Sequence, residues 1–190
     1  MRAFVAIALP PRARDALERV QEALPLGRAA DPDQLHLTLA FLGERPDAEV
    51  EAAHEALEGL SFVPFALQLS GLDVFEPRKP EVLWAGIKDD AALRALQTRV
   101  LSALHGAGLP LERRRFRPHV TLARFGPMSP ADHERLARFL GRWSSFPSPP
   151  FTVSGFGLWR SMLRRDGAVH EELARYGAGG AAWDPARDPA

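Results

Sequence analysis

The sequence predicts a bilobal α+β protein: two related lobes of mostly antiparallel sheet, with helices on their outer faces and a central cleft. Three observations predict this fold. A β-type phrase occurs twice, as His-Leu-Thr-Leu at 36–39 and His-Val-Thr-Leu at 119–122. Each copy lies in the same order of strand, helix, histidine-containing strand, helix and strand, a unit of roughly 80 residues and too long for a solenoid repeat. A hairpin pattern around residues 71–80 favours antiparallel pairing.

The first half of the chain alternates short β-type runs with amphipathic segments. Pro10 and Pro11 end the first run and open a helix, since proline is tolerated in a first helical turn. Gly43 stops the first histidine-containing strand. The predicted elements are a strand over 4–9, a helix over 12–24, a turn over 27–33, a strand over 35–42, a helix over 47–60 and a strand over 65–72.

The second half repeats this order. Ser129 and Pro130 form a cap and first-turn pair for its second helix. The predicted elements are a strand over 82–87, a helix over 91–105, a strand over 116–125, a helix over 129–140, a long strand or bent pair over 151–163, and a strand over 168–176. We expect one bilobal domain over 1–176 and a flexible tail over 177–190, which is rich in Gly, Ala, Pro and Asp.

Composition excludes several classes of protein. The 190 residues include 24 Lys and Arg against 24 Asp and Glu, so high affinity for long nucleic acid through global basicity is not expected. The absence of cysteine excludes disulfides, thiolate metal sites and thiol nucleophiles. No apolar stretch approaches the roughly 20 residues of a membrane helix, and the first run is too short for a secretory signal. We therefore expect a cytoplasmic protein with no membrane association.

Each phrase places one imidazole and one hydroxyl on the same surface. Residues i and i+2 of a strand point to one face, so His36 and Thr38 share a face, as do His119 and Thr121. The intervening apolar residues face a core. The plain alternative is a strand that includes histidine by chance and threonine for its β-propensity, but two matching copies in matching places argue against it.

Two imidazoles facing one space suit displacement at phosphorus. A neutral histidine accepts a proton from water and a protonated one gives a proton to the departing oxygen, and both forms coexist near a pKa of about 6.5. Entering and leaving oxygens lie on opposite sides of phosphorus, which suits an acid and a base on facing strands. Threonine hydroxyls can donate to the non-bridging oxygens. His36, Thr38, His119 and Thr121 together resemble a cradle for one phosphoryl group.

Two further residues stand at equal offsets after the histidines. Arg124 lies five positions after His119 and would face away on a regular strand, whereas a twist or bulge would return its guanidinium toward the phosphate. Its alternative is an exposed arginine at a strand end. Phe41 stands five positions after His36, with a core aromatic as the common fate and contact with a nucleoside as the other.

Other chemistries find less support. A metal site would need clustered histidines or carboxylates within the phrases, and neither phrase contains Asp or Glu, so no metal or cofactor is expected. The basic run over 113–117 reads equally well as a solvated strand face, so no site is placed there. His54, His105 and His133 are expected at helix surfaces, and His170 in the last strand is left open.

At these residues the chain resembles the 2H phosphoesterase superfamily, named for two His-x-Thr/Ser-x motifs. Within it, the chain is similar to the bacterial and archaeal RNA 2′,3′-cyclic phosphodiesterases, also called 2′-5′ RNA ligases. The similar stretches are Arg-Ala-Phe-Val-Ala-Ile at 2–7, Leu-His-Leu-Thr-Leu-Ala-Phe-Leu-Gly at 35–43, Val-Leu-Trp-Ala-Gly at 82–86 and Phe-Arg-Pro-His-Val-Thr-Leu-Ala-Arg at 116–124. After Tyr176 the Gly-Ala-rich end departs from the family's usual apolar finish.

The resemblance implies pseudo-two-fold symmetry, with both motifs in a central active-site cleft. It implies metal-independent opening of an RNA 2′,3′-cyclic phosphate to a 2′-phosphomonoester, and reversible 2′-5′ ligation of RNA ends. Carried over by position, the catalytic pair is His36 and His119, the phosphate ligands are Thr38, Thr121 and Arg124, and Phe41 contacts the terminal nucleoside.

The expected partner is an RNA end or oligonucleotide carrying a 2′,3′-cyclic phosphate, bound by a monomer. Two rivals stay open at this point. One keeps the fold but acts on small cyclic nucleotides, and the other is a module that binds nucleotides or RNA ends without turnover.

Overall fold

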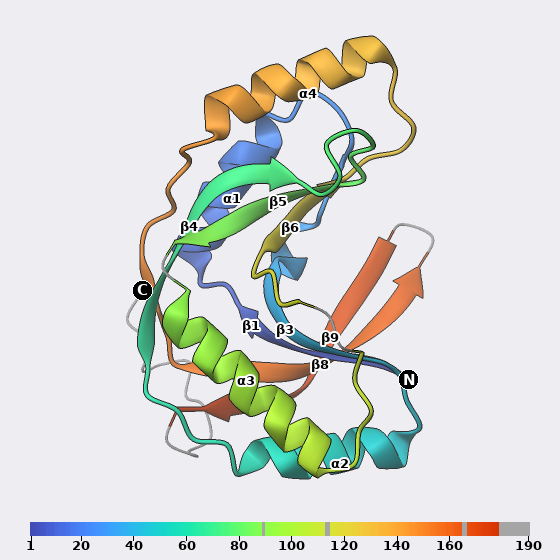
Figure 1. The fold of residues 1–190 in the computed structure, drawn as a ribbon, viewed down its shortest axis with the longest axis vertical. Coiled ribbons are helices and arrows are strands. Elements are labelled where there is room, and N and C mark those ends of the chain that lie inside the picture. Colours follow the sequence, from blue (N-terminus) through green and yellow to red (C-terminus); the bar gives the residue numbers. More distant parts are fainter. Residues whose placement is uncertain (89, 113–114, 165–166, 179–190) are drawn as a thin grey trace.

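The computed structural model describes residues 1–88, 90–112, 115–164 and 167–178 (Figure 1). Its first seven elements are β1 (Arg2–Ala8), α1 (Pro11–Glu22), β2 (Arg28–Ala29), the short 3-10 helix η1 (Pro32–Gln34), β3 (His36–Glu44), α2 (Asp47–Glu58) and β4 (Phe65–Val74). The remaining seven are β5 (Val82–Lys88), α3 (Ala91–Gly106), β6 (Val120–Arg124), α4 (Pro130–Trp143), β7 (Phe151–Val153), β8 (Gly155–Arg164) and β9 (Gly167–Gly177).

One continuous antiparallel sheet carries the fold. Its strand order is β7-β4-β5-β6-β3-β1-β8-β9. The short strand β2 lies outside this order and pairs with the end of β6. The two strands that bear the His-Thr phrases are neighbours at the centre of this order, joined at Leu37 and Val120. The predicted α+β class, the antiparallel pairing and the hairpin of β4 with β5 are confirmed.

The two lobes exchange elements instead of each containing one half of the sequence. The strand that follows α2, β4, pairs with β5 of the second half, and β8 pairs with β1 of the first. The helices cross over too, since α1 packs on β6 and α3 packs on β3. Figure 1 shows α1 and α4 with β4, β5 and β6 in the upper part, and α2 and α3 with β1, β3 and β8 below.

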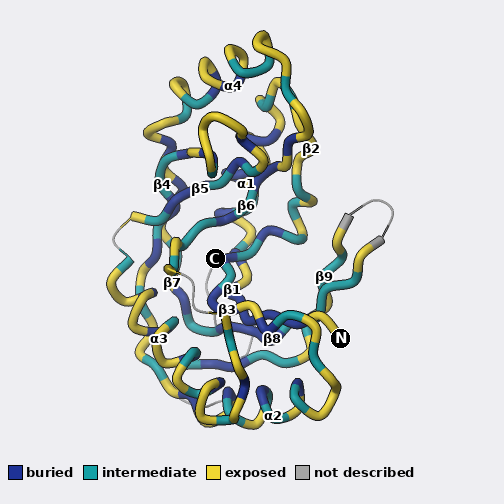
Figure 2. Tube along the Cα trace, turned by 45° about the vertical axis from the view of Figure 1, so that its right-hand side comes forward, coloured by how far each residue is buried: buried dark blue, intermediate teal, exposed yellow. Residues whose placement is uncertain are grey.

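A single apolar core underlies both phrases. The alternating residues predicted to face inward are buried, with exposures of 0% at Leu37, Val120 and Leu122 and 2% at Leu39. The apolar stripes of the helices meet them, and Figure 2 shows the buried positions along the central strands and the exposed ones on the outer sides of the helices. Burial of these leucine and valine side chains, each stabilising by about 1.5–3 kcal/mol, fixes which face of β3 and β6 remains for polar groups.

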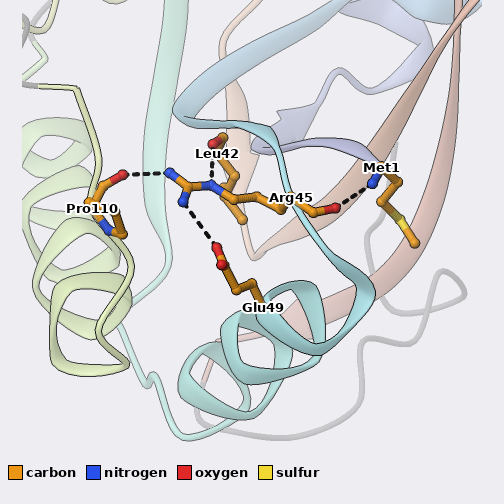
Figure 3. Close-up of polar contacts among 5 residues, drawn as sticks. All are labelled: Met1, Leu42, Arg45, Glu49 and Pro110. Atoms are coloured by element: carbon orange, nitrogen blue, oxygen red, sulfur yellow. Dashed lines mark hydrogen bonds and ion pairs between the residues drawn. The ribbon is translucent and has the colours of Figure 1, made fainter.

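Arg45 locks the end of β3 to its surroundings (Figure 3). Its guanidinium donates to the carbonyl oxygen of Leu42 at 2.7 Å, to Glu49 on α2 at 3.0 Å and to the carbonyl oxygen of Pro110. Its backbone N–H donates to the carbonyl oxygen of Met1 at 2.8 Å. One half-buried side chain thereby joins β3, α2 and the segment after α3.

Several predicted boundaries change. Strand β6 covers only five residues because Pro118, inside the predicted strand over 116–125, lacks the N–H that a ladder needs. The run over 151–163 is a bent pair, in which β7 pairs with β4 and β8 pairs with β1. The predicted turn over 27–33 contains β2 and the start of η1. At the start of α4, Ser129 caps the helix as predicted and forms a capping box with Asp132.

Two sequence-based predictions concern the tail and membrane-spanning helices. Residues 179–190, most of the predicted tail, lie outside the described residues. Among the helices that the structure describes, none is long and apolar enough to span a bilayer.

Candidate active site

The central strand pair brings the four phrase residues into one array. Antiparallel partners point to the same face, so Leu37 and Val120 both point into the core. The residues on either side of them therefore share the opposite face. In a regular ladder this register places His36 nearest to Thr121 and Thr38 nearest to His119. The electrostatic influence of His119 on the pKa of His36 shows that the two imidazoles are close to each other. All four side chains are half-buried.

A β-bulge in β3 turns Phe41 onto the face of this array. Strand β1 pairs Ala6 with Thr38 and Val5 with Ala40, so Leu39 is an extra residue in the ladder. Beyond it, Phe4 pairs with Phe41, and Phe4 is on the same face as Ala6. Phe41 is 64% exposed, so its interpretation as a core aromatic is wrong.

A second bulge, at the equivalent place in β6, does the same for Arg124. Strand β5 pairs Trp84 with Thr121 and Leu83 with Ala123, which leaves Leu122 as the extra residue. Arg124 then pairs with Val82 and lies on the face of Thr121. The irregularity that the spacing of Arg124 required is therefore present, and the two halves match residue by residue.

Both imidazoles are held by the same hydrogen bond. Nδ1 of His36 lies 2.7 Å from the carbonyl oxygen of Gln34, and Nδ1 of His119 lies 2.7 Å from that of Arg117. Because a carbonyl oxygen only accepts, Nδ1 carries the hydrogen in each ring. Nε2 is thereby the nitrogen that can take up or release a proton, and a backbone contact fixes the plane of each ring.

Burial disfavours the protonated form of both rings. The pKa of His36 is lowered to about 4, chiefly by burial and to a smaller extent by the nearby imidazoles of His170 and His119, while the Gln34 hydrogen bond opposes this shift. Burial also lowers the pKa of His119, with Arg117 and Arg124 adding to the effect. These electrostatic influences show that His119 and Arg124 are close enough to interact. An anion placed over the array would favour the imidazolium form and raise both pKa values.

The surroundings of the two histidines differ. His119 meets the edge of Phe75, with ring centroids 4.9 Å apart, and the Arg117 guanidinium lies over that ring. His36 packs on Phe4 at 4.8 Å and meets His170 edge-on at 5.0 Å. Both histidines therefore contact an apolar ring, and His36 contacts a titratable ring in addition.

His170 and Gln34 are residues of the site region that the sequence did not reveal. The side-chain oxygen of Gln34 accepts a hydrogen bond from the backbone N–H of His170 at 2.6 Å, while its carbonyl oxygen holds His36. Gln34 thus ties β9 to the start of β3. Position 34 precedes the phrase by two residues, but only the register of β9 shows what faces it.

The other histidines lie apart from the array. His105 is exposed at the end of α3, as predicted, and His133 bonds to the carbonyl oxygen of Ser129 in the first turn of α4. His54 is half-buried and lies 2.9 Å from the hydroxyl of Tyr176, so it is more enclosed than predicted. Within the described ranges, no group of three or more His, Cys, Asp or Glu side chains could hold a metal ion.

Comparisons with known proteins find one group of relatives. The sequence profile described as "2'-5' RNA ligase superfamily" matches residues 9–164. A Thermus thermophilus protein named RNA 2′,3′-cyclic phosphodiesterase is 32% identical over 93% of this chain and 89% of its own. A protein of the same name from Archaeoglobus fulgidus is 29% identical over 91% of this chain and 98% of its own. The crystal structure of E. coli LigT in apo form superposes with a TM-score of 0.75 and 26% identity, covering 93% of this chain and 96% of that one.

Proposed function

The chain belongs to the 2′-5′ RNA ligase superfamily, and from this premise we propose that it is an RNA 2′,3′-cyclic phosphodiesterase that works with two histidines and no metal ion. The observation that carries the proposal is the pairing of β3 with β6. It sets two half-buried imidazoles on one face, each with Nδ1 tied to the backbone and Nε2 free to exchange a proton. Relatives over nearly the whole chain bear this enzyme's name.

The reaction needs one proton taken and one proton given. The neutral imidazole accepts a proton at Nε2 from water as its oxygen bonds to phosphorus. The bond from phosphorus to O3′ breaks, and the protonated imidazole gives its Nε2 proton to O3′. The product is a 2′-phosphomonoester beside a free 3′-hydroxyl. With the 5′-hydroxyl of a second RNA in place of water, the same steps form a 2′-5′ linkage and are reversible.

The remaining residues of the array hold the charge of the phosphate. The hydroxyls of Thr38 and Thr121 donate to its non-bridging oxygens, and the guanidinium of Arg124 adds a positive charge at the edge. Binding this anion raises the pKa of both histidines, which burial lowers in the free site, and so favours the protonated partner that the reaction needs. The roles of acid and base are left open between His36 and His119.

Phe41 is placed to contact the terminal nucleoside. Its ring is largely exposed on the face of the array, and its centroid lies 6.3 Å from that of Phe4. An exposed ring supported by a buried one offers a flat surface for a base or sugar. This role depends on the proposed substrate. It would account for a phenylalanine that is exposed to solvent and not packed in the core.

We further propose one bilobal unit over residues 1–176 that acts as a cytoplasmic monomer. The continuous sheet supports the single unit, because the β3–β6 pair joins both lobes and each lobe contains elements of both halves. Light scattering on the purified chain would measure the oligomeric state directly.

Product analysis tests the proposal. An oligonucleotide ending in a 2′,3′-cyclic phosphate is incubated with the protein, with and without EDTA, and the products are separated. We expect a 2′-phosphate end at the same rate in both conditions. A 3′-phosphate product, tight binding without any product, or a loss of activity in EDTA that a divalent ion restores would each contradict the proposal.

A further inference from the structure

A cavity of about 740 Å³ lies next to the candidate active site. It includes His36 and Gln34 at the start of β3, yet Thr38, His119 and Thr121 do not line it. Its other walls come from the end of β1 and the first turn of α1, from residues 149–154, which include β7, and from strands β8 and β9. The cavity therefore adjoins the array at His36 and extends away from Thr38, His119 and Thr121.

Its apolar walls have the form of a base-binding surface. Prolines and aromatic rings supply them, among them Pro10, Pro149, Phe151 and Trp159, and the volume falls in the usual range of small-ligand sites. The indole of Trp159 is half-buried and nearly parallel to the ring of Phe4, at 6.4 Å and 15°. Phe4 in turn packs on His36, so the aromatic surface is continuous with the catalytic pair.

The charged side chains that line the cavity include one arginine without an acidic partner among the described residues. Arg14 forms an ion pair with Asp33 at 2.8 Å, and Arg175 forms a two-pronged ion pair with Glu172. Within each pair the positive and the negative charge cancel. Arg12, exposed in the first turn of α1, forms no ion pair with any described residue. That turn contains no acidic residue either. The cavity thus offers one uncompensated positive side chain, which suits one phosphodiester.

We propose that this cavity is a second nucleotide subsite, which binds the nucleotide on the 5′ side of the one that bears the cyclic phosphate. Its base stacks on Trp159, and the phosphodiester between the two nucleotides contacts Arg12. This proposal rests on the proposed function. The terminal nucleoside has its own aromatic surface at Phe41, which does not line the cavity, while His36 belongs to both spaces. RNA ends would therefore be better substrates than mononucleotides.

The test compares kcat/KM for a dinucleotide with a 2′,3′-cyclic phosphate end and for the matching mononucleoside 2′,3′-cyclic phosphate. Their ratio is independent of the fraction of folded enzyme. In Trp159→Ala we expect the ratio to fall about 10-fold, the effect of losing one base stack, and in Trp159→Phe to fall less. Arg12→Glu should lower the ratio most at low salt. The matched control is Arg19→Glu, an exposed arginine of the same helix that does not line the cavity.

Each outcome decides the matter. A ratio that falls in the Trp159 and Arg12 variants but not in Arg19→Glu supports the subsite. An unchanged ratio overturns it, and so does an equal loss on both substrates, which would assign the cavity to the terminal nucleoside. If the unmodified protein converts neither substrate, the proposed function itself fails, which is a distinct result.

Discussion

Replacing His36 with asparagine should make the protein less sensitive to acid. The Asn amide can still donate to the carbonyl oxygen of Gln34 in place of Nδ1, but it cannot be protonated. In the folded chain burial lowers the pKa of His36 to about 4, from an ordinary value of 6.5. Between these values the unfolded state binds more protons than the folded state, so stability falls as the pH drops from 6.5 toward 4.

The magnitude follows from this difference in pKa. At pH 5 an unfolded imidazole is almost fully protonated, whereas His36 in the folded protein is about one-tenth protonated, which costs about 2 kcal/mol relative to pH 7.5. Urea unfolding at the two pH values measures the loss in each protein. The variant should lose about 2 kcal/mol less than the unmodified chain, while His105→Asn, at an exposed position of α3, should lose as much as the unmodified chain. Equal losses in all three proteins would refute the reasoning.

Three further predictions concern catalysis and the frame of the site. Thr121→Val should lower kcat about 100-fold without changing the melting temperature, and Thr121→Ser should restore much of it; normal turnover in the valine variant would exclude the hydroxyl as a phosphate ligand. Because burial lowers the pKa of both catalytic histidines, kcat/KM should already decline below pH 6.5 as the protonated imidazole is lost. His170→Phe should move this decline to higher pH, because it removes an imidazole whose charge in the acid range lowers the pKa of His36; an unmoved profile would count against this coupling. Arg45→Ala removes three side-chain hydrogen bonds and should cost about 2 kcal/mol in urea unfolding, against almost nothing for Arg138→Ala, whose side chain is 71% exposed; equal costs would contradict the locking role.

The sequence predicted the helices, the strands and the two His-Thr pairs more fully than the way in which the strands are arranged in space. The spacing of His36 with Thr38 and of His119 with Thr121 sets each pair on one face, and the apolar residues between them bury that strand in the core. These are local rules of strand geometry, which need no knowledge of the partner strand. The exchange of β4 and β8 between the lobes could not be predicted, because it depends on which strands pair with each other across long distances in the sequence.

The bulges explain why two residues with the same spacing were hard to place. A regular strand would turn Arg124 and Phe41 away from the histidines. Both phrases, however, continue with two adjacent apolar residues, Leu39 with Ala40 and Leu122 with Ala123, and in each pair both residues are buried. Two consecutive buried positions break the alternation of a strand, so this repeated pair is the signal that could have revealed the bulge.

His170 could not have been found by the same means. It lies in β9, far from the phrases along the chain, and meets His36 only because β9 joins the sheet beyond β8. Its place in a strand sets it apart from His54, His105 and His133, but nothing in the local pattern of that strand indicates what it faces. Long-range register alone brings it to the site.

The most direct test of the central claim is the turnover of the histidine variants on an RNA with a 2′,3′-cyclic phosphate end. His36→Ala and His119→Ala should each lower kcat by about 100- to 10,000-fold, and the double variant should lose far less than the product of the two, because the imidazoles act as a unit. Folding is checked by the melting temperature. Turnover close to that of the unmodified protein in either single variant would contradict the account.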